Sequence, residues 1–159
     1  MRLTILAIGR LKDGPERTLY ERYAERTAAA GRAVALTIAL REFPESRAGS
    51  APARIAEEAA AIGDAIPGDS RLVVLDETGT SIASPVFAEK IARWRDDGAR
   101  DAAFVIGGAD GLGRALRDRA DLVLALGAMT WPHQLVRIML AEQLYRAVTI
   151  LTGHPYHRV

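Results

Sequence analysis

Short apolar runs recur along the chain and alternate with longer segments that have helical spacing. Nearly every residue in these runs is apolar, which is typical of strands covered on both faces of a parallel sheet. The predicted strands are residues 3–9, 34–40, 72–75, 103–106 and 122–126. The pattern therefore predicts five buried strands rather than strands with one face in solvent.

The segments between the strands have apolar residues three or four positions apart, as amphipathic helices do. The predicted helices are residues 15–30, 54–66, 85–97, 113–120 and 134–151. In the first helix Leu19, Tyr23 and Thr27 fall on one face, and Gly31 is expected to end it. Residues 41–53 are rich in Pro, Ser and Gly, so we expect a polar, mobile loop there.

Strands that alternate with helices predict an α/β fold with a parallel sheet between two layers of helices. The length of 159 residues fits one domain over residues 1–159. Ligands of such folds gather beyond the carboxyl ends of the strands. The loops in which to search for a site are therefore residues 76–84, 107–113 and 127–133.

The composition narrows the class of protein. Cysteine is absent, which excludes disulfides and thiolate metal sites and is consistent with a reducing cytoplasm. The apolar run at residues 3–9 is too short to span a membrane, so we expect a cytoplasmic protein without a membrane segment. The net charge of +1 is small for a protein that holds nucleic acid by charge alone.

The first candidate site is the glycine-rich stretch from Gly107 to Gly113, directly after a predicted strand. Its four glycines allow a ligand to approach the backbone closely. The stretch matches neither G-x-G-x-x-G nor a P-loop, which favours a nucleoside ligand without a triphosphate over ATP or NAD. A tight strand-to-helix turn with no ligand is the alternative, because a glycine run alone is weak evidence.

The second candidate site is the stretch from Leu126 to Gln134, which also joins a strand to a helix. Met129 and Trp131 offer apolar walls for a flat ring, and the free amides at the start of the helix can hold polar or anionic groups. Taken singly, core packing of Trp131 and helix capping by His133 are the simpler interpretations.

The predicted helix over residues 134–151 is apolar on most sides, so we expect part of it to contact a second subunit. Among its polar residues, Glu142 and Arg146 are four apart and can pair with each other. A buried helix would also deliver the tail His154–Val159 to a fixed place. The tail is therefore a candidate component of a site rather than a frayed end.

The histidines allow a different kind of site. His133, His154 and His157 could in principle form a three-histidine metal site. Nothing in the sequence supplies the second shell that such sites have, so we expect no metal. A serine hydrolase is also disfavoured, because the chain has no G-x-S-x-G motif.

Linked motifs over the whole chain resemble the RlmH family, bacterial SPOUT enzymes that methylate a pseudouridine in large-subunit ribosomal RNA. The motifs are Leu3-Thr4-Ile5-Leu6-Ala7-Ile8-Gly9-Arg10-Leu11-Lys12, Leu75-Asp76 with Gly79, Ile106-Gly107-Gly108 with Gly111-Leu112, Met129-Thr130-Trp131-Pro132-His133-Gln134, Glu142-Gln143-Leu144-Tyr145-Arg146-Ala147 and His154-Pro155-Tyr156-His157-Arg158. Trp131 departs from the family pattern, in which phenylalanine or leucine is common at this position.

The resemblance implies a parallel-sheet SPOUT fold with a carboxyl-terminal trefoil knot, a homodimer, and S-adenosylmethionine as methyl donor. By motif match the cofactor would contact Leu75, Gly107, Leu126, Gly127, Ala128, Met129, Thr130 and Trp131. The implied reaction is methylation of N3 of a pseudouridine in 23S ribosomal RNA, on an assembled ribosome. The alternative is a ribosome-associated binding protein of the same fold that lacks catalysis.

Catalytic candidates follow from this reaction. N3 carries a proton that must be lost, so a positioned base or water is useful. His157 and Arg158 are the candidates for handling the base and its phosphate, and Arg137 and Tyr145 are supporting candidates. The motifs do not identify the general base.

Overall fold

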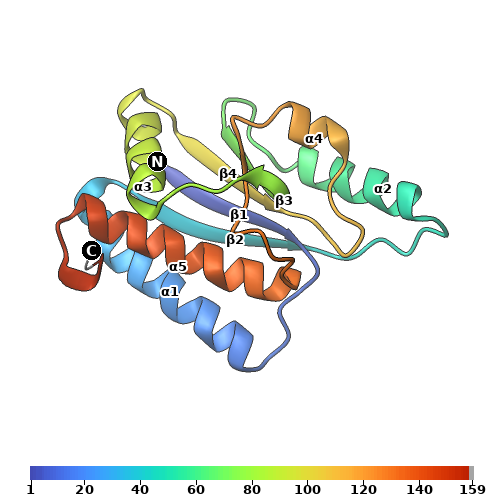
Figure 1. Cartoon of the computed structure of the whole chain (residues 1–159), viewed down its shortest axis with the longest axis horizontal. Helices are drawn as coiled ribbons and strands as arrows, with labels where there is room; N and C mark the ends of the chain where they lie inside the picture. Colours follow the sequence, from blue (N-terminus) through green and yellow to red (C-terminus); the bar gives the residue numbers. More distant parts are fainter. Residues whose placement is uncertain (158–159) are drawn as a thin grey trace.

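The computed structural model describes residues 1–157, of His157 the backbone alone, and its strands form one parallel sheet (Figure 1). The strands are β1 (Arg2–Ile8), β2 (Thr37–Phe43), β3 (Arg71–Thr80), β4 (Asp101–Ile106) and β5 (Leu122–Leu124), in the order β2-β1-β4-β3-β5. Every adjacent pair is parallel. The expected α/β fold is confirmed, while the trefoil knot remains a prediction.

Helices cover both faces of the sheet (Figure 1). One face packs against α1 (Pro15–Gly31), α3 (Ser84–Asp96) and α5 (His133–Leu151), and the other against α2 (Ala51–Gly63) and α4 (Arg114–Asp118). Two short 3₁₀ turns are η1 (Arg32–Val34) and η2 (Pro155–His157). No helix among the described residues is long and apolar enough to cross a membrane.

The strand side chains explain why the apolar runs are continuous. In β1, Leu3, Ile5 and Ala7 belong to the core beneath α1, α3 and α5, whereas Leu6 and Ile8 belong to the core beneath α2. Since successive strand residues point to opposite faces, a sheet covered twice needs apolar residues at every position. The other strands divide between the same two cores.

Several element boundaries differ from the sequence prediction. The second strand begins three residues late, because Val34 belongs to η1 and Ala35 takes a left-handed conformation with φ 53°. The first helix ends at Gly31 itself, one residue later than predicted, because Gly31 is still helical. Gly31 lies so close to the Leu36 carbonyl that a Cβ would collide with it. The expected loop is shorter than predicted, since Ser50 caps α2 by accepting a hydrogen bond from the Ala53 amide.

The structure also corrects two predicted helix faces. On α1 Thr27 is buried and Tyr23 packs partly against the core, as predicted, but Leu19 is 36% exposed and Tyr20 is buried in its place. On α5 the packing of α1 and α3 within the same chain already buries most of the apolar surface. Most of this helix therefore needs no second subunit to cover it, and Leu135 is an apolar residue that stays 40% exposed.

Candidate functional site

A cleft of about 790 Å³ lies beyond the carboxyl ends of β3, β4 and β5. The loops that follow these strands form its walls, as the parallel-sheet rule predicts. Seven of the eight residues expected to contact a cofactor line it: Leu75, Gly107, Leu126, Gly127, Met129, Thr130 and Trp131. Ala128 is not among the lining residues, and it is exposed.

The base of the cleft is apolar and its rim is open. Leu75, Ile106 and Leu124 are buried residues at the ends of the three strands, and each lines the cleft. Met129 and Trp131 are 70% and 39% exposed, so they stand at the rim rather than in the core. This arrangement suits a flat, apolar ring that enters between the strand ends.

Polar groups on the β3 side connect the walls of the cleft. The Thr130 hydroxyl donates to Glu77 Oε2 at 2.7 Å, which ties the loop after β5 to the end of β3. Burial alone would raise the pKa of Asp76, but hydrogen bonds from Thr78 and the charge of Arg117 together hold that pKa below its usual value. Asp76 therefore stays ionised at the cleft wall, a role that the sequence motifs did not indicate.

The glycine-rich loop after β4 folds back on itself. A Cβ on Gly107 would lie 2.7 Å from Leu112 Cγ and 2.9 Å from the Gly111 carbonyl oxygen. Gly111 has a φ of 89°, which favours glycine. Arg54 of α2 holds the loop from outside through an ion pair of 2.6 Å with Asp110. The turn itself therefore requires glycine at positions 107 and 111. The same glycines leave one wall of the cleft open.

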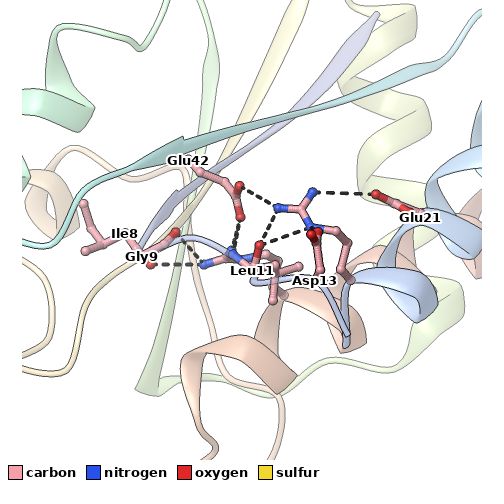
Figure 2. Close-up of polar contacts among 8 residues, drawn as sticks. Ile8, Gly9, Leu11, Asp13, Glu21 and Glu42 are labelled. Carbon is pink, nitrogen blue, oxygen red and sulfur yellow. Dashed lines mark hydrogen bonds and ion pairs between the residues drawn. The ribbon is translucent and has the colours of Figure 1, made fainter. Parts of the chain in front are cut away.

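Arg137 is fully buried and is not among the residues that line the cleft; its partners Ile8, Gly9 and Glu42 are labelled in Figure 2. Its Nη2 donates to the carbonyls of Ile8 and Gly9 at 3.0 and 3.2 Å, and its Nη1 pairs with Glu42 Oε1. The same Glu42 oxygen accepts the Leu11 amide at 2.8 Å. Arg137 therefore clamps the first turns of α5 to the ends of β1 and β2. This placement does not support its candidacy as a group that contacts substrate.

Replacing Arg137 by Met is expected to destabilise the fold by about 3–5 kcal/mol, because Glu42 loses its close buried partner and keeps only the longer 3.6 Å pair with Arg17. Urea unfolding followed by circular dichroism measures this change. Arg93→Met is the matched control, since Arg93 and Glu89 pair with side chains that are each 68% exposed, and about 0–1 kcal/mol is expected. Equal stability of the two variants would show that the clamp contributes nothing.

The tail begins at the opposite end of α5 from the cleft (Figure 1). Tyr156 packs on Tyr145 with ring centroids 4.6 Å apart, and its hydroxyl donates to Glu142 at 3.1 Å. The expected pair of Glu142 and Arg146 is present at 2.6 Å. Tyr145 is thus a buried anchor for the tail. The side chain of His157 and all of Arg158 lie outside the described residues.

The positions of the histidines exclude a three-histidine metal site within one chain. His133 begins α5 and His154 follows its end, and 19 helical residues span about 28 Å. Two ligands of one metal ion cannot be this far apart. The metal interpretation is therefore wrong for a site built by a single subunit.

Comparison with known proteins defines the class of protein to which this chain belongs. A family model described as "Predicted SPOUT methyltransferase" matches residues 1–157. Over 159 residues the chain is 58% identical to "Ribosomal RNA large subunit methyltransferase H" of Bradyrhizobium diazoefficiens, with 99% of both chains covered. A protein of the same name from Bradyrhizobium sp. strain ORS 278 is 59% identical, with 99% of this chain and 98% of the relative covered. The chain belongs to the RlmH family of SPOUT methyltransferases.

A solved structure shares the fold at much lower sequence similarity. It is described as a probable methylase family protein from Haemophilus influenzae Rd KW20, with 15% identity and a TM-score of 0.50. The match covers 99% of this chain and 70% of that one. It confirms the architecture, and the family assignment rests on the sequence matches.

Proposed function

We propose that this protein is an S-adenosylmethionine-dependent methyltransferase that acts on N3 of a pseudouridine in 23S ribosomal RNA. The observation that carries the proposal is the cleft at the strand ends, in a chain 58% identical along its length to a large-subunit methyltransferase. The alternative, a binding protein of the same fold without catalysis, has no need for a methyl donor.

The residues of the cleft fit S-adenosylmethionine. Leu75, Ile106 and Leu126 offer an apolar surface for the adenine ring, and the backbone of the loop over residues 127–131 can bond its polar edge. Asp76 and Glu77 on the opposite wall place negative charge near a ligand that carries an ammonium and a sulfonium. When bound, the cofactor supplies an electrophilic methyl group.

The protein's contribution to such a reaction is mainly positional. Transfer requires N3 of the base to lie in line with the methyl group and its sulfur, and holding that geometry lowers the barrier. A base that is stacked or paired must also be extruded before it can enter the cleft. Met129 and Trp131 stand exposed at the rim, where an extruded base would arrive.

We also propose that the tail of one subunit completes the cleft of the other. The cleft lies at the start of α5, the tail follows the end of this helix, and 19 helical residues span about 28 Å. The three residues after Tyr156 can span only about 11 Å. This separation along α5 favours a tail that acts on the partner rather than on the cleft of its own chain. In a two-fold dimer with antiparallel α5 helices, the end of one helix lies near the start of the other. This arrangement would bring His157 and Arg158 to the partner's cleft.

An apolar groove supports the proposed homodimer. It has a volume of about 450 Å³ and lies beside α1 and α5. Leu19, which is 36% exposed, and Met139 line it together with Tyr23 and Ile138. An exposed apolar groove continuous with α5 is a suitable surface for a second copy of the chain.

Charge substitution in this groove is expected to separate the subunits. Leu19→Glu and Met139→Glu should convert the dimer to a monomer at micromolar concentration, because burying an unpaired carboxylate is costly. Light scattering measures the mass. Val86→Glu is the control, since Val86 is 48% exposed on α3 and does not line the groove. A wild-type monomer would contradict the proposal, as would Glu variants that remain dimeric.

Gly107→Val is expected to abolish binding of S-adenosylmethionine. The valine side chain would collide with Leu112 and the Gly111 backbone, so the loop would have to move and change the cleft wall. Calorimetry measures the affinity, and circular dichroism checks the fold. Gly49→Val is the matched control because nothing lies within 4 Å of a Cβ there. Unchanged affinity in the Gly107 variant would remove this loop from the binding site.

The low net charge bears on the form of the RNA substrate. A protein that neutralises many phosphates normally carries clustered positive charge, and this chain has a net charge of only +1. An assembled ribosome offers shape and protein surfaces besides phosphate. We therefore propose that the substrate is RNA within the ribosome, which also places the protein in the cytoplasm.

Labelled S-adenosylmethionine tests the proposed function on ribosomes from a strain that lacks this methyltransferase. Label should enter large-subunit RNA, and naked 23S RNA should accept much less. If the ribosomes take up no label and the protein also binds no S-adenosylmethionine, the result would favour the non-catalytic alternative.

A further inference from the structure

Gly9, the first residue after β1, brings a carboxylate and an imidazole together. It has a φ of 80°, and a Cβ on it would lie 3.0 Å from Glu45 Oε1 and 3.4 Å from His133 Nε2. Both groups therefore lie on the same open side of the glycine, no farther apart than the sum of these distances. A side chain at this position would push them apart.

The backbone around Gly9 is held by the buried Arg137 clamp (Figure 2). Arg137 and His133 are four residues apart on α5, so they lie on the same face of the helix. Arg137 donates to the Gly9 carbonyl, and the Gly9 amide donates to the Phe43 carbonyl at 2.8 Å. Glu45 follows Phe43 by two residues. Bonds to the backbone of Gly9 thus hold the helix turn that carries His133 and the end of the strand that precedes Glu45.

His133 faces the proposed cofactor site as well as Glu45. It lines the cleft beside Pro132 and Val136, and it is half-buried. Within the described residues no hydrogen bond occupies its ring nitrogens, although Glu45 lies close to one edge. Glu45 makes no ion pair with this ring among the described residues. An imidazole that lines the cleft and has its nitrogens unoccupied by hydrogen bonds is placed to act as a general base.

We propose that His133 accepts the N3 proton of the target base; this inference rests on the proposed function. Neutral His133 takes the proton and becomes an imidazolium, and the N3 electron pair forms the new bond to the methyl carbon. The bond between that carbon and sulfur breaks, and its electrons neutralise the sulfonium. The imidazolium then releases the proton to water.

The charges around His133 are mixed. Glu45 approaches from the loop between β2 and α2, and the walls of the cleft carry further charged groups. These groups are Asp76, Glu77, Asp110 and Arg117. On its own helix, Arg137 is already paired with Glu42. Glu45 is the carboxylate that lies beside the ring at Gly9.

Single-turnover methylation of ribosomes across a pH range tests the proposal. With the wild-type protein, the rate should rise with pH through the titration of one histidine and then level off. His133→Gln should lower the plateau by about 10²–10⁴-fold and abolish the rise. Glu89→Gln on α3, with an exposed carboxylate, is the control and should match wild type.

The outcomes separate this inference from the proposed function. If wild type transfers methyl groups and His133→Gln keeps the full rate and the pH rise, His133 is not the base. If His133→Gln reacts at the normal rate once S-adenosylmethionine is saturating, His133 is a cofactor contact and the inference is also wrong. A wild-type protein that transfers no methyl group contradicts the proposed function itself. Circular dichroism and calorimetric affinity exclude misfolding of the variants.

Discussion

Deletion of His157–Val159 is expected to abolish methyl transfer while leaving the dimer and cofactor binding nearly unchanged. The structure sets the point of truncation, because Tyr156 packs on Tyr145 and bonds Glu142 and should be retained. The loss should be about 10²–10⁴-fold in turnover. Contacts made to the reacting base in the transition state affect turnover more than ground-state binding of the cofactor.

Turnover on ribosomes, calorimetry with S-adenosylmethionine and light scattering measure the three properties separately. His157→Ala and Arg158→Ala divide the loss between base and phosphate contacts, and deletion of Val159 alone is the control. A truncated protein that methylates ribosomes at the normal rate would remove the tail from the site. A large loss of cofactor affinity would instead assign the tail to cofactor binding.

Two inactive variants are expected to restore activity when combined in one dimer. The first subunit carries Gly107→Val and an intact tail, and the second lacks His157–Val159 but keeps an intact cleft. If the tail acts on the partner, the heterodimer contains one complete site and should have about half the wild-type activity. Each homodimer contains no complete site and should be inactive.

The two subunits can be co-expressed with different affinity tags, so that only the heterodimer survives two purification steps. Its turnover is compared with that of both homodimers and of a wild-type dimer bearing the same tags. An inactive heterodimer would mean that tail and cleft must belong to the same chain. The distance of about 28 Å along α5 argues against that result.

The sheet could be predicted from the sequence because both of its faces are covered. Runs such as residues 72–75 and 103–106 are continuous and apolar, and they fall within β3 and β4. Their order in the sheet could not be predicted, since β1 lies between β2 and β4 through contacts distant in sequence. The knot was implied by family resemblance alone.

The errors in the prediction have local causes. The second strand was placed too early because Val34 and Leu36 are apolar, yet Ala35 interrupts them with a positive φ that alanine rarely adopts. On α1 the heptad-like spacing of Leu19 and Tyr23 suggested the core face, while packing of the helix against α5 buries Tyr20. Periodicity locates a helix more reliably than it locates its buried face.

The cleft was predictable in outline, and its polar partners were not. The rule that ligands bind beyond strand ends identified three loops that do meet. The bond between Thr130 and Glu77 joins residues 53 positions apart, and the pair of Arg137 and Glu42 joins residues 95 apart. An arginine within an apolar helix signals a buried partner, but the sequence does not say which carboxylate it is.

Identification of the methylated nucleoside tests the central claim most directly. The purified protein is incubated with labelled S-adenosylmethionine and ribosomes that lack the modification, and the large-subunit RNA is digested to nucleosides for tandem mass spectrometry. The account predicts that the label is found in pseudouridine methylated at N3, at one position in 23S RNA. Label in small-subunit RNA, on another nucleoside, or in no RNA at all would contradict it.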